Sequence, residues 1–431
     1  MGLIGILVLI LLLIGVPIGA AFWLPSVFGA STIGLEPEMI AANVPYQTAI
    51  GFSLLAIPYF ILAGQIMSDG GLVRHIVALA QLALGKLKGA VGYVVIGASA
   101  LFGATTGSSV ATVATISASM GEEMVKRGYK RDYVASLIAS AGLLGVLLPP
   151  SIPMIIFASV VGESVGELFL AILIPGVIFI VGFMLMHRYY ARRGLRSPED
   201  ADGDPGTMSL RIDESEKGGR WGVLLRAIAP LMMPVIMLGG IYSGIFTPTE
   251  AAAAGAVYGL TLALLTRGLK FKMLPGTFLR AAVPAAAILI IMSLASSFNR
   301  VLTIERVPQT IAEFATNAIT SQAVFLVVLL LISFLVGMFM ETNAAILIMA
   351  PLLYPTAMMF DVNPIHFGVI LVTTLEIGMI TPPLAVNIFV AAKSNGASVV
   401  RMMPYVLRFI LMSAVLMVVI TFVPWLTTWH L

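Results

Sequence analysis

Glycine and hydroxyl residues gather in an otherwise apolar stretch, GATTGSSVATVATIS at 103–117. Hydroxyls and the carbonyls of an unwound backbone provide oxygen-only ligation, which suits a hard monovalent cation such as Na⁺. A packing interpretation stays open, because Gly103 and Gly107 form a small-xxx-small motif that lets two helices approach closely. The hydroxyls that crowd the centre of the stretch are those of Thr105, Thr106, Ser108 and Ser109.

A second polar patch lies in GMFMETNAAILIMAP at 337–351. Glu341 is costly in an apolar stretch unless it is paired or lines a water-filled cavity, so it is a functional candidate; a place at a helix end near the interface is the alternative. Thr342 and Asn343 are short enough for a hairpin tip. We expect Asn343 to cap the returning helix, whose free amides would bind a substrate carboxylate.

Two proline pairs interrupt apolar segments in the same way, in GVLLPP at 145–150 and GMITPP at 378–383. Each glycine gives the backbone freedom, and each proline pair leaves upstream carbonyls unpaired. An ion, water or a neighbouring side chain can satisfy those carbonyls. The alternative is a kink that serves packing alone. Polar atoms near the two breaks come from Ser140 and Ser151 in the first and from Glu376, Thr381 and Asn387 in the second.

The composition places these patches in a membrane. Hydrophobic residues make up 59% of the 431 residues and charged residues only 10%, where soluble domains carry roughly a quarter. Apolar runs of about 20 residues, long enough to cross a bilayer, recur along the chain. We expect 2–24 to be the first transmembrane helix rather than a cleaved signal. Cysteine is absent, which excludes disulfides and thiolate chemistry.

The basic residues are clustered and predict the topology. One cluster surrounds the hydrophilic linker 190–221, and a second, shorter one lies at 126–131. By the positive-inside rule both face the cytoplasm, and they indicate topology rather than nucleic-acid binding. The segment 68–90 is amphipathic and is expected to lie along the interface. Within it, Asp69 and Arg74 are expected to pair.

The linker divides the chain into halves that repeat one pattern, a polar patch followed about forty residues later by a proline break. Paired interrupted segments are typical of secondary transporters with a site near the midplane. The sequence therefore predicts an all-α polytopic membrane protein with two inverted repeats, each holding a re-entrant helical hairpin and a discontinuous helix. The predicted parts are a first repeat 1–189 with a hairpin near 91–119 and a broken helix near 133–160, and a second repeat 222–431 with a hairpin near 322–358 and a broken helix near 364–392.

The sequence gives little indication of an enzyme or of an ATP-driven pump. The chain has no G-x-x-x-x-G-K-[ST] phosphate loop, and its four histidines are scattered without metal-ligand spacing. Ser243 has no histidine placed as its base. Glu250 follows Thr247-Pro248, which is typical of a capped helix start and favours a structural role. We expect a transporter subunit, not an enzyme.

Several strings resemble one family. MVKRGYKRDY, LLPPSIPMI, YSGIFTPTEAAA and LEIGMITPP are similar to the large membrane subunit (M subunit) of TRAP, or tripartite ATP-independent periplasmic, transporters, across essentially the whole chain. The resemblance implies an elevator-type secondary transporter, like those of the ion-transporter superfamily, in the bacterial inner membrane. It also implies Na⁺ coupling with two or more ions, and a carboxylated organic substrate such as a C4-dicarboxylate, sialic acid or a related sugar or keto acid.

The resemblance further implies two protein partners. A periplasmic substrate-binding protein (P-type) would deliver the acid, and a small membrane subunit (Q-type), expected as a separate chain, would brace the scaffold. The resemblance implies no cofactor for this chain other than the coupling ion, Na⁺. A permease or channel energised by another component is the alternative function.

By position, the resemblance also implies site residues. The first Na⁺ site would use Ser108, Ser109, Gly145, Leu148, Pro149 and Pro150. The second would use Thr342, Asn343, Gly378, Thr381 and Pro382. The substrate would lie between the two tips, against Thr106, Ser108, Ser109, Thr342, Asn343 and Asn387.

Overall fold

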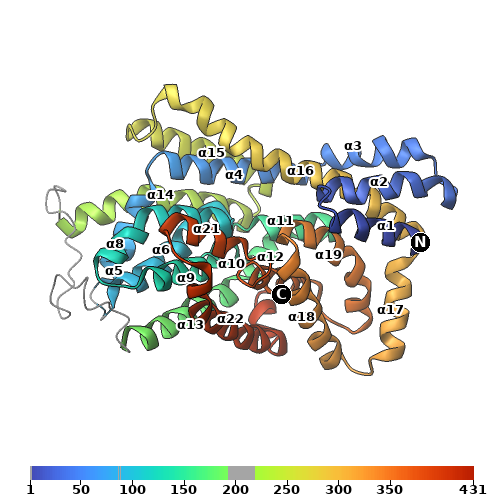
Figure 1. Ribbon diagram of the computed structural model, residues 1–431. Helices are drawn as coiled ribbons and strands as arrows, with labels where there is room; N and C mark the ends of the chain where they lie inside the picture. Colours follow the sequence, from blue (N-terminus) through green and yellow to red (C-terminus); the bar gives the residue numbers. More distant parts are fainter. Residues whose placement is uncertain (1, 86, 88, 193–218) are drawn as a thin grey trace.

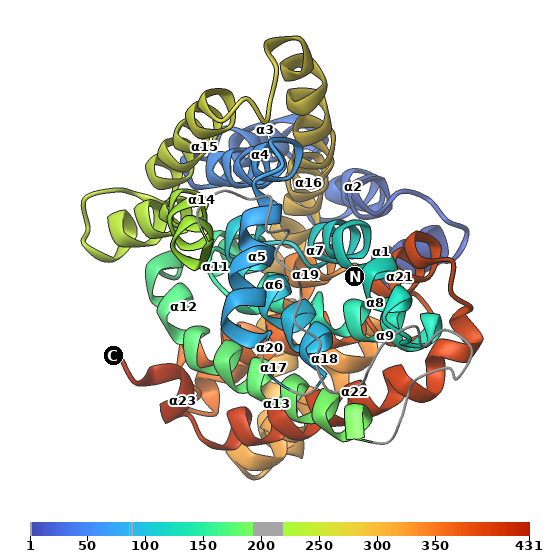
Figure 2. The same ribbon diagram turned by 90° about the vertical axis from the view of Figure 1, so that its left-hand side faces the viewer.

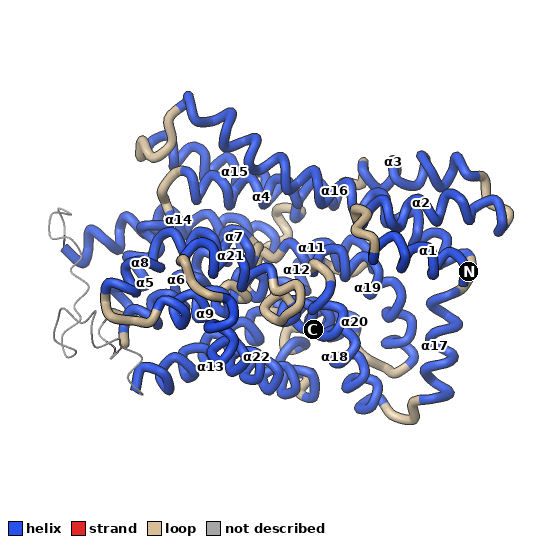
Figure 3. Tube along the Cα trace, viewed as in Figure 1, coloured by secondary structure: helices blue, strands red, loops and turns tan. Residues whose placement is uncertain are grey.

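A computed structural model describes residues 2–85, 87, 89–192 and 219–431, and in these ranges the chain is helical without strands (Figure 3). The predicted linker 190–221 lies mostly outside the described residues. In chain order the α-helices are α1 (Gly2–Leu13), α2 (Ile18–Ala30), α3 (Val44–Ala49), α4 (Ala56–Asp69), α5 (Val73–Leu84), α6 (Ala90–Thr106), α7 (Ser109–Ile116), α8 (Glu122–Lys126), α9 (Arg131–Ala141), α10 (Leu144–Leu147), α11 (Ile152–Val161), α12 (Val165–Ala171), α13 (Leu173–Arg192), α14 (Gly219–Tyr242), α15 (Pro248–Leu265), α16 (Leu274–Ile304), α17 (Val307–Ala318), α18 (Gln322–Phe339), α19 (Thr342–Met359), α20 (Pro364–Gly378), α21 (Val386–Asn395), α22 (Val399–Phe422) and α23 (Trp425–Thr428).

Among the described residues, seven helices are long and apolar enough to cross a membrane, or up to nine if each bent pair counts as one span. Many of their large apolar side chains are exposed to the surroundings, as Leu225, Val283 and Leu411 are. Because such exposure is favourable in lipid and unfavourable in water, the chain is a multi-pass membrane protein. The predicted all-α polytopic fold is confirmed.

An outer layer of helices packs along one side of the molecule. It consists of α1–α4 and α14–α16, in which α4 contacts α15 and α16, and α2 contacts α16 (Figure 1). In the view of Figure 2, α3, α4, α15 and α16 lie above α5, α6 and α13. The start of α15 follows from its sequence: Thr247 and Glu250 form a reciprocal capping box with Pro248 at the first turn, as predicted.

Two helical hairpins, one from each half of the chain, belong to the remaining helices, which we call the inner bundle. Hairpin 1 is α6–α7 and turns at tip 1, residues 106–109, where Gly107 takes a left-handed φ of +63° that favours glycine. Hairpin 2 is α18–α19 and turns at tip 2, residues 340–343, through extended backbone at Met340 and Glu341. The hairpins enter from opposite ends of the molecule (Figure 1), as inverted repeats require.

Two broken helices pack against the hairpins. Broken helix 1 consists of α9, α10 and α11, with break 1 at residues 148–151 and a bend of 42°. Broken helix 2 consists of α20 and α21, with break 2 at residues 379–385. The proline pairs lie in the breaks, where the backbone cannot continue its helical hydrogen bonds. Each half therefore holds one re-entrant hairpin and one discontinuous helix.

Residues 73–84 of the predicted amphipathic segment form α5, which follows α4 after a bend of 75°. Its apolar face is buried through Val73, Ile76 and Val77, against α6 and α14. The expected pairing of Asp69 with Arg74 is wrong: Asp69 pairs with Arg280 of α16, Nη2 to Oδ2 at 2.7 Å. The ion pair thus joins two helices of the outer layer that are more than 200 residues apart.

Candidate functional site

The two tips meet at a cavity of about 470 Å³ between the outer layer and the inner bundle. Its size falls within the range of small-molecule sites. The outer wall comes from α4 and α16, through Gln65, Ser68, Pro284 and Ile288. The inner wall comes mainly from both tips and includes Thr106, Ser108, Ser109, Glu341, Thr342, Asn343 and Glu376. Among the described lining residues two are acidic and none is basic.

Tip 1 is ordered by its own backbone and by break 1. Ser108 caps α7 by accepting a hydrogen bond from Ala111 N at 3.4 Å, and the Thr112 hydroxyl donates to the Ser108 carbonyl at 2.8 Å. The amide of Ile152, just after break 1, donates to the Gly107 carbonyl at 3.2 Å. Break 1 therefore lies directly behind tip 1, as its predicted role requires.

Tip 2 differs from the prediction in one respect. Glu341, not Asn343, is the N-cap of α19: its carboxylate accepts from Ala344 N at 3.2 Å and from Asn343 Nδ2 at 2.6 Å. The expectation that this helix offers free amides to a substrate carboxylate is wrong at Ala344, because the protein's own carboxylate occupies that donor. A negative charge at a helix N-terminus also interacts favourably with the helix dipole.

Break 2 is held by hairpin 2 in the same way as break 1 is held by hairpin 1. The amide of Leu384 donates to the Met338 carbonyl at 3.0 Å. Gly378 packs against the backbone of Gly337 so closely that a Cβ would overlap it, and Gly145 packs equally tightly against the Ser108 carbonyl. In both halves a glycine before the proline pair lets broken helix and hairpin touch backbone to backbone.

Polar side chains from both halves converge between the tips. The Thr342 hydroxyl donates to Glu376 Oε2 at 2.8 Å, and Ser109 Oγ lies 3.5 Å from Asn387 Oδ1 across 278 residues of sequence. The Ser109 hydroxyl also lies close enough to Glu376 to interact with it. Tip 1, tip 2 and broken helix 2 therefore share one polar cluster.

The predicted site residues fall into two groups. Five line the cavity, namely Thr106, Ser108, Ser109, Thr342 and Asn343, and Asn387 is buried beside Ser109. The others lie in or before the breaks, outside the lining: Gly145, Leu148, Pro149, Pro150, Gly378, Thr381 and Pro382. Pro149 and Pro150 are buried, whereas Pro382 is exposed. The Thr381 hydroxyl, in break 2, donates to the Ile377 carbonyl of the preceding helix α20 at 3.0 Å.

Sequence reasoning missed the outer wall of the cavity. Gln65 donates to Asp69 Oδ1 at 2.8 Å, and Asp69 in turn binds Arg280. The only local signal was a glutamine within the apolar helix α4. The sequence places Glu376 near the second break, but its bond to Thr342 depends on a tertiary contact that no local pattern encodes.

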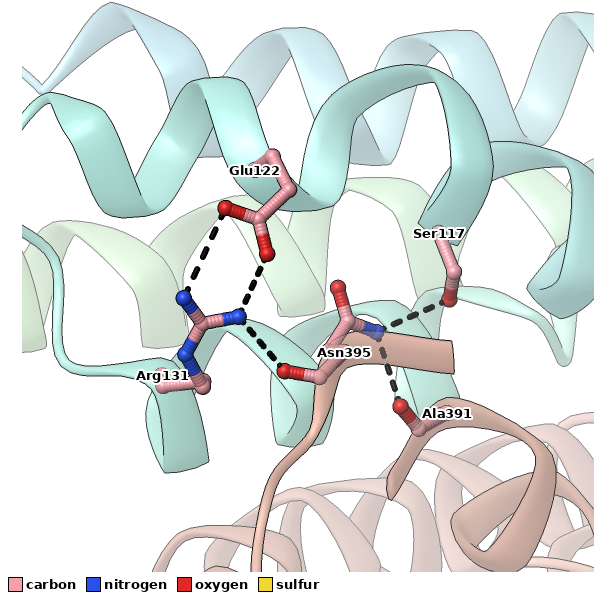
Figure 4. A network of polar contacts seen from close by, with 5 residues as sticks. All are labelled: Ser117, Glu122, Arg131, Ala391 and Asn395. Carbon is pink, nitrogen blue, oxygen red and sulfur yellow. Dashed lines mark hydrogen bonds and ion pairs between the residues drawn. The ribbon is translucent and has the colours of Figure 1, made fainter. Parts of the chain in front are cut away.

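A second polar network joins the two halves at the far end of hairpin 1 (Figure 4). Asn395, the last residue of α21, donates to Ser117 Oγ at 3.0 Å and to the Ala391 carbonyl at 2.8 Å. Arg131 donates to the Asn395 carbonyl at 2.7 Å and also pairs with Glu122. Arg131 belongs to the loop KRGYKR at 126–131, so this string has a structural role as an anchor for α21.

Comparison with known proteins gives the class first. The solved structure of the YdaH transporter of Alcanivorax borkumensis matches with a TM-score of 0.60 over 89% of this chain and 88% of that chain. At 17% identity the likeness shows the fold alone. Together with the multi-pass architecture, it defines the class of fold: an all-helical, multi-pass membrane fold that this chain shares with that protein.

The family follows from sequence. A family model described as the DctM component of tripartite ATP-independent periplasmic transporters matches residues 5–426, and the chain belongs to this family. The C4-dicarboxylate TRAP transporter large permease protein DctM of Pseudomonas aeruginosa is 36% identical, over 92% of this chain and 91% of the relative. The predicted transporter subunit, rather than an enzyme, is confirmed.

Two further relatives carry other names. The 2,3-diketo-L-gulonate TRAP transporter large permease protein YiaN of Escherichia coli is 33% identical, over 95% of this chain and 94% of the relative. The isethionate TRAP transporter permease protein DctMQ of Oleidesulfovibrio alaskensis is 35% identical over 96% of this chain. The chain spans only 63% of that longer relative.

Proposed function

We propose that the chain is the large transmembrane subunit of a Na⁺-coupled secondary transporter that imports a carboxylated organic solute. The observation that carries this proposal is the convergence of Ser109, Asn387, Thr342 and Glu376 from both halves at one cavity. A site built from two repeats can open to either side by moving one body against another. The proposed motion is of the elevator type, with the inner bundle sliding along the outer layer.

The proposed Na⁺ sites lie behind the tips. The first is formed by Ser108 and Ser109 with the backbone from Gly145 to Pro150, and the second by Thr342 and Asn343 with Gly378, Thr381 and Pro382. Their support is the close packing of tip 1 on Gly145 and of hairpin 2 on Gly378, which brings backbone oxygens together. Carbonyl and hydroxyl oxygens suit Na⁺. Ser108, Ser109 and Asn343 would also face the substrate, along with Thr106, Thr342 and Asn387.

The proposed substrate is a small organic acid: a C4-dicarboxylate, sialic acid or a related sugar or keto acid. The relatives named for C4-dicarboxylate, isethionate and 2,3-diketo-L-gulonate all carry names of organic acids. Because the described cavity lining holds acidic side chains and no basic one, bound cations rather than arginine or lysine would supply the positive charge that the acid requires. This links substrate binding to Na⁺ directly.

The proposed partners and location follow from family membership. A periplasmic binding protein would deliver the acid, and a small membrane subunit, proposed here as a separate chain, would brace the outer layer. The complex would lie in the bacterial inner membrane with the linker 190–221 in the cytoplasm. The positive clusters on both sides of that linker support this orientation.

The proposal is tested by reconstitution of the chain with both partners in liposomes. An inward Na⁺ gradient is expected to drive accumulation of the acid, and an equal K⁺ gradient is not. Equal uptake with K⁺ would contradict Na⁺ coupling. Uptake that requires ATP and an additional subunit would favour the alternative of a permease energised by another component.

A further inference from the structure

We propose a cation site between the two tips, additional to the two Na⁺ sites behind them, in which the Glu376 carboxylate is the charged ligand. Its other ligands are the hydroxyls of Ser109 and Thr342 and the side-chain oxygen of Asn387. The inference rests on the proposed function, because it concerns the ions that accompany the same substrate. It assigns to Glu376 a role that the sequence left open.

Glu376 is an unusual group for the middle of a membrane protein. Its side chain is 2% exposed, and it lies at the cavity near the end of α20. Oε2 accepts the hydrogen bond from Thr342, but Oε1 has no hydrogen-bond partner among the described residues. A buried carboxylate oxygen without a partner is strongly unfavourable, and a bound cation would remove that penalty.

The neighbouring groups offer oxygens from four different elements. Ser109 lies at the start of α7, Thr342 at the start of α19, Glu376 in α20 and Asn387 in α21. Asn387 is fully buried, and its Nδ2 likewise has no partner among the described residues. A cation here would therefore draw hairpin 1, hairpin 2 and both parts of broken helix 2 together.

The donor set indicates an alkali cation and specifically Na⁺. All four donors are oxygens, which hard cations prefer over nitrogen or sulfur sites. The part of the chain that the structure describes has no group of three or more His, Cys, Asp or Glu side chains that could hold a metal. A single carboxylate with neutral oxygens suits a monovalent ion better than a divalent one. The site shares Ser109 and Thr342 with the two proposed Na⁺ sites and adds two ligands that neither of them uses, the Glu376 carboxylate and the Asn387 side-chain oxygen.

This location also explains how an acid can bind beside acidic residues. Glu341 and Glu376 both line the cavity, and like charges repel strongly where water is excluded. A cation on Glu376 would present positive charge to the substrate from the place where the tips meet. The acid would then contact the ion and the tip hydroxyls together.

The test counts Na⁺ per acid in liposomes that hold the complete complex, by measuring the membrane potential at which net uptake reverses. Glu376→Gln is expected to lower the Na⁺-to-acid ratio by one relative to wild type. The matched control is Glu250→Gln, which keeps a capping side chain outside the cavity and is expected to leave the ratio unchanged. An unchanged ratio in Glu376→Gln would overturn the proposal.

If Glu376→Gln folds but does not transport, bound ²²Na⁺ is counted on the purified complex. One ion fewer than wild type supports the site, and an equal number overturns it. If the variant does not fold, Na⁺ binding is measured on Asn387→Ala, because Asn387 is the other proposed ligand that the two Na⁺ sites do not use. About tenfold weaker binding of one ion supports the site, and binding equal to wild type overturns it. Wild-type uptake without Na⁺ dependence would instead contradict the proposed function itself.

Discussion

The Thr342 hydroxyl donates a 2.8 Å hydrogen bond to the Glu376 carboxylate and so joins tip 2 to broken helix 2. Thr342 is 1% exposed, so this bond lies out of contact with bulk solvent. Hydrogen bonds to charged groups in such an environment are stronger than neutral ones. Because Thr342 begins α19 and Glu376 lies just before break 2, the bond couples the position of the hairpin to the shape of the break.

Removing this hydroxyl should impair both stability and transport. Thr342→Val leaves Glu376 with no donor at Oε2, and we expect a loss of roughly 1–3 kcal/mol in the free energy of unfolding. Thr342→Ser keeps the hydroxyl and should stay close to wild type. Thermal unfolding of the purified protein in detergent compares the two variants with wild type. A Thr342→Val variant as stable as wild type would contradict a stabilising role for this bond.

The Ser109 hydroxyl at tip 1 and the Asn343 side-chain amide at tip 2 should determine the affinity of the transporter for Na⁺. Ser109→Ala and Asn343→Ala each remove a proposed oxygen donor, and we expect the Na⁺ concentration for half-maximal uptake to rise about tenfold, equivalent to ~1.4 kcal/mol. Ser119→Ala is the control, because its exposed hydroxyl bonds to the Thr115 carbonyl and does not line the cavity. Unchanged Na⁺ activation in both tip variants would remove these side chains from the ion sites.

The glycine before break 1 should tolerate no side chain. In Gly145→Ala the new Cβ would lie 2.5 Å from Thr112 Oγ1 and 2.6 Å from the Ser108 carbonyl oxygen. Overpacking of this kind is expected to destabilise the fold by about 1–3 kcal/mol and to shift tip 1. Gly239→Ala has no atom within 4 Å of its Cβ and serves as the control. Equal melting temperatures for the two variants would contradict the proposed close contact.

The network at the far end of hairpin 1 should depend on its buried member. Asn395→Ala leaves Ser117 without its donor and is expected to destabilise the protein by roughly 1–3 kcal/mol. Glu122→Gln should change stability little, because the exposed pair with Arg131 is screened by solvent. Denaturation of the two purified variants makes the comparison, and the opposite order of effects would be inconsistent with this network.

The contribution of the Glu122–Arg131 pair to stability should depend on pH. Hydrogen bonding and charge from Arg131 lower the pKa of Glu122. Its contribution to stability is therefore present at neutral pH and above the ordinary carboxyl pKa, and it is lost as the pH falls through the lowered pKa. We expect the free energy of unfolding of wild type to exceed that of Glu122→Gln by a small amount that stays constant near neutral pH and disappears in acid. A difference in unfolding free energy that grows in acid would contradict this sign.

Local signals in the sequence predicted the parts of the fold that local chemistry determines. The proline pairs predict where two helices are interrupted, because proline lacks the backbone donor that a continuing helix requires. The Thr247–Glu250 box predicts where α15 starts. The hydroxyl-rich and Glu-Thr-Asn patches predicted which residues would line the tips.

Contacts between distant residues could not be predicted in this way. Asp69 was expected to pair with its neighbour Arg74, but the tertiary fold brings Arg280 closer. Asn343 was expected to cap α19, but Glu341 caps it through the Ala344 amide and accepts from Asn343 as well. Both errors arise because several side chains compete for one partner, and only the three-dimensional arrangement decides between them.

The most direct test of the central claim is entry of ²²Na⁺ itself. The complete complex is reconstituted in liposomes, and ²²Na⁺ uptake is measured with and without the acid-loaded binding protein. We expect addition of the acid to accelerate ²²Na⁺ entry, and removal of Na⁺ to abolish entry of the acid. Entry of the acid with no accompanying ²²Na⁺ would contradict Na⁺-coupled import.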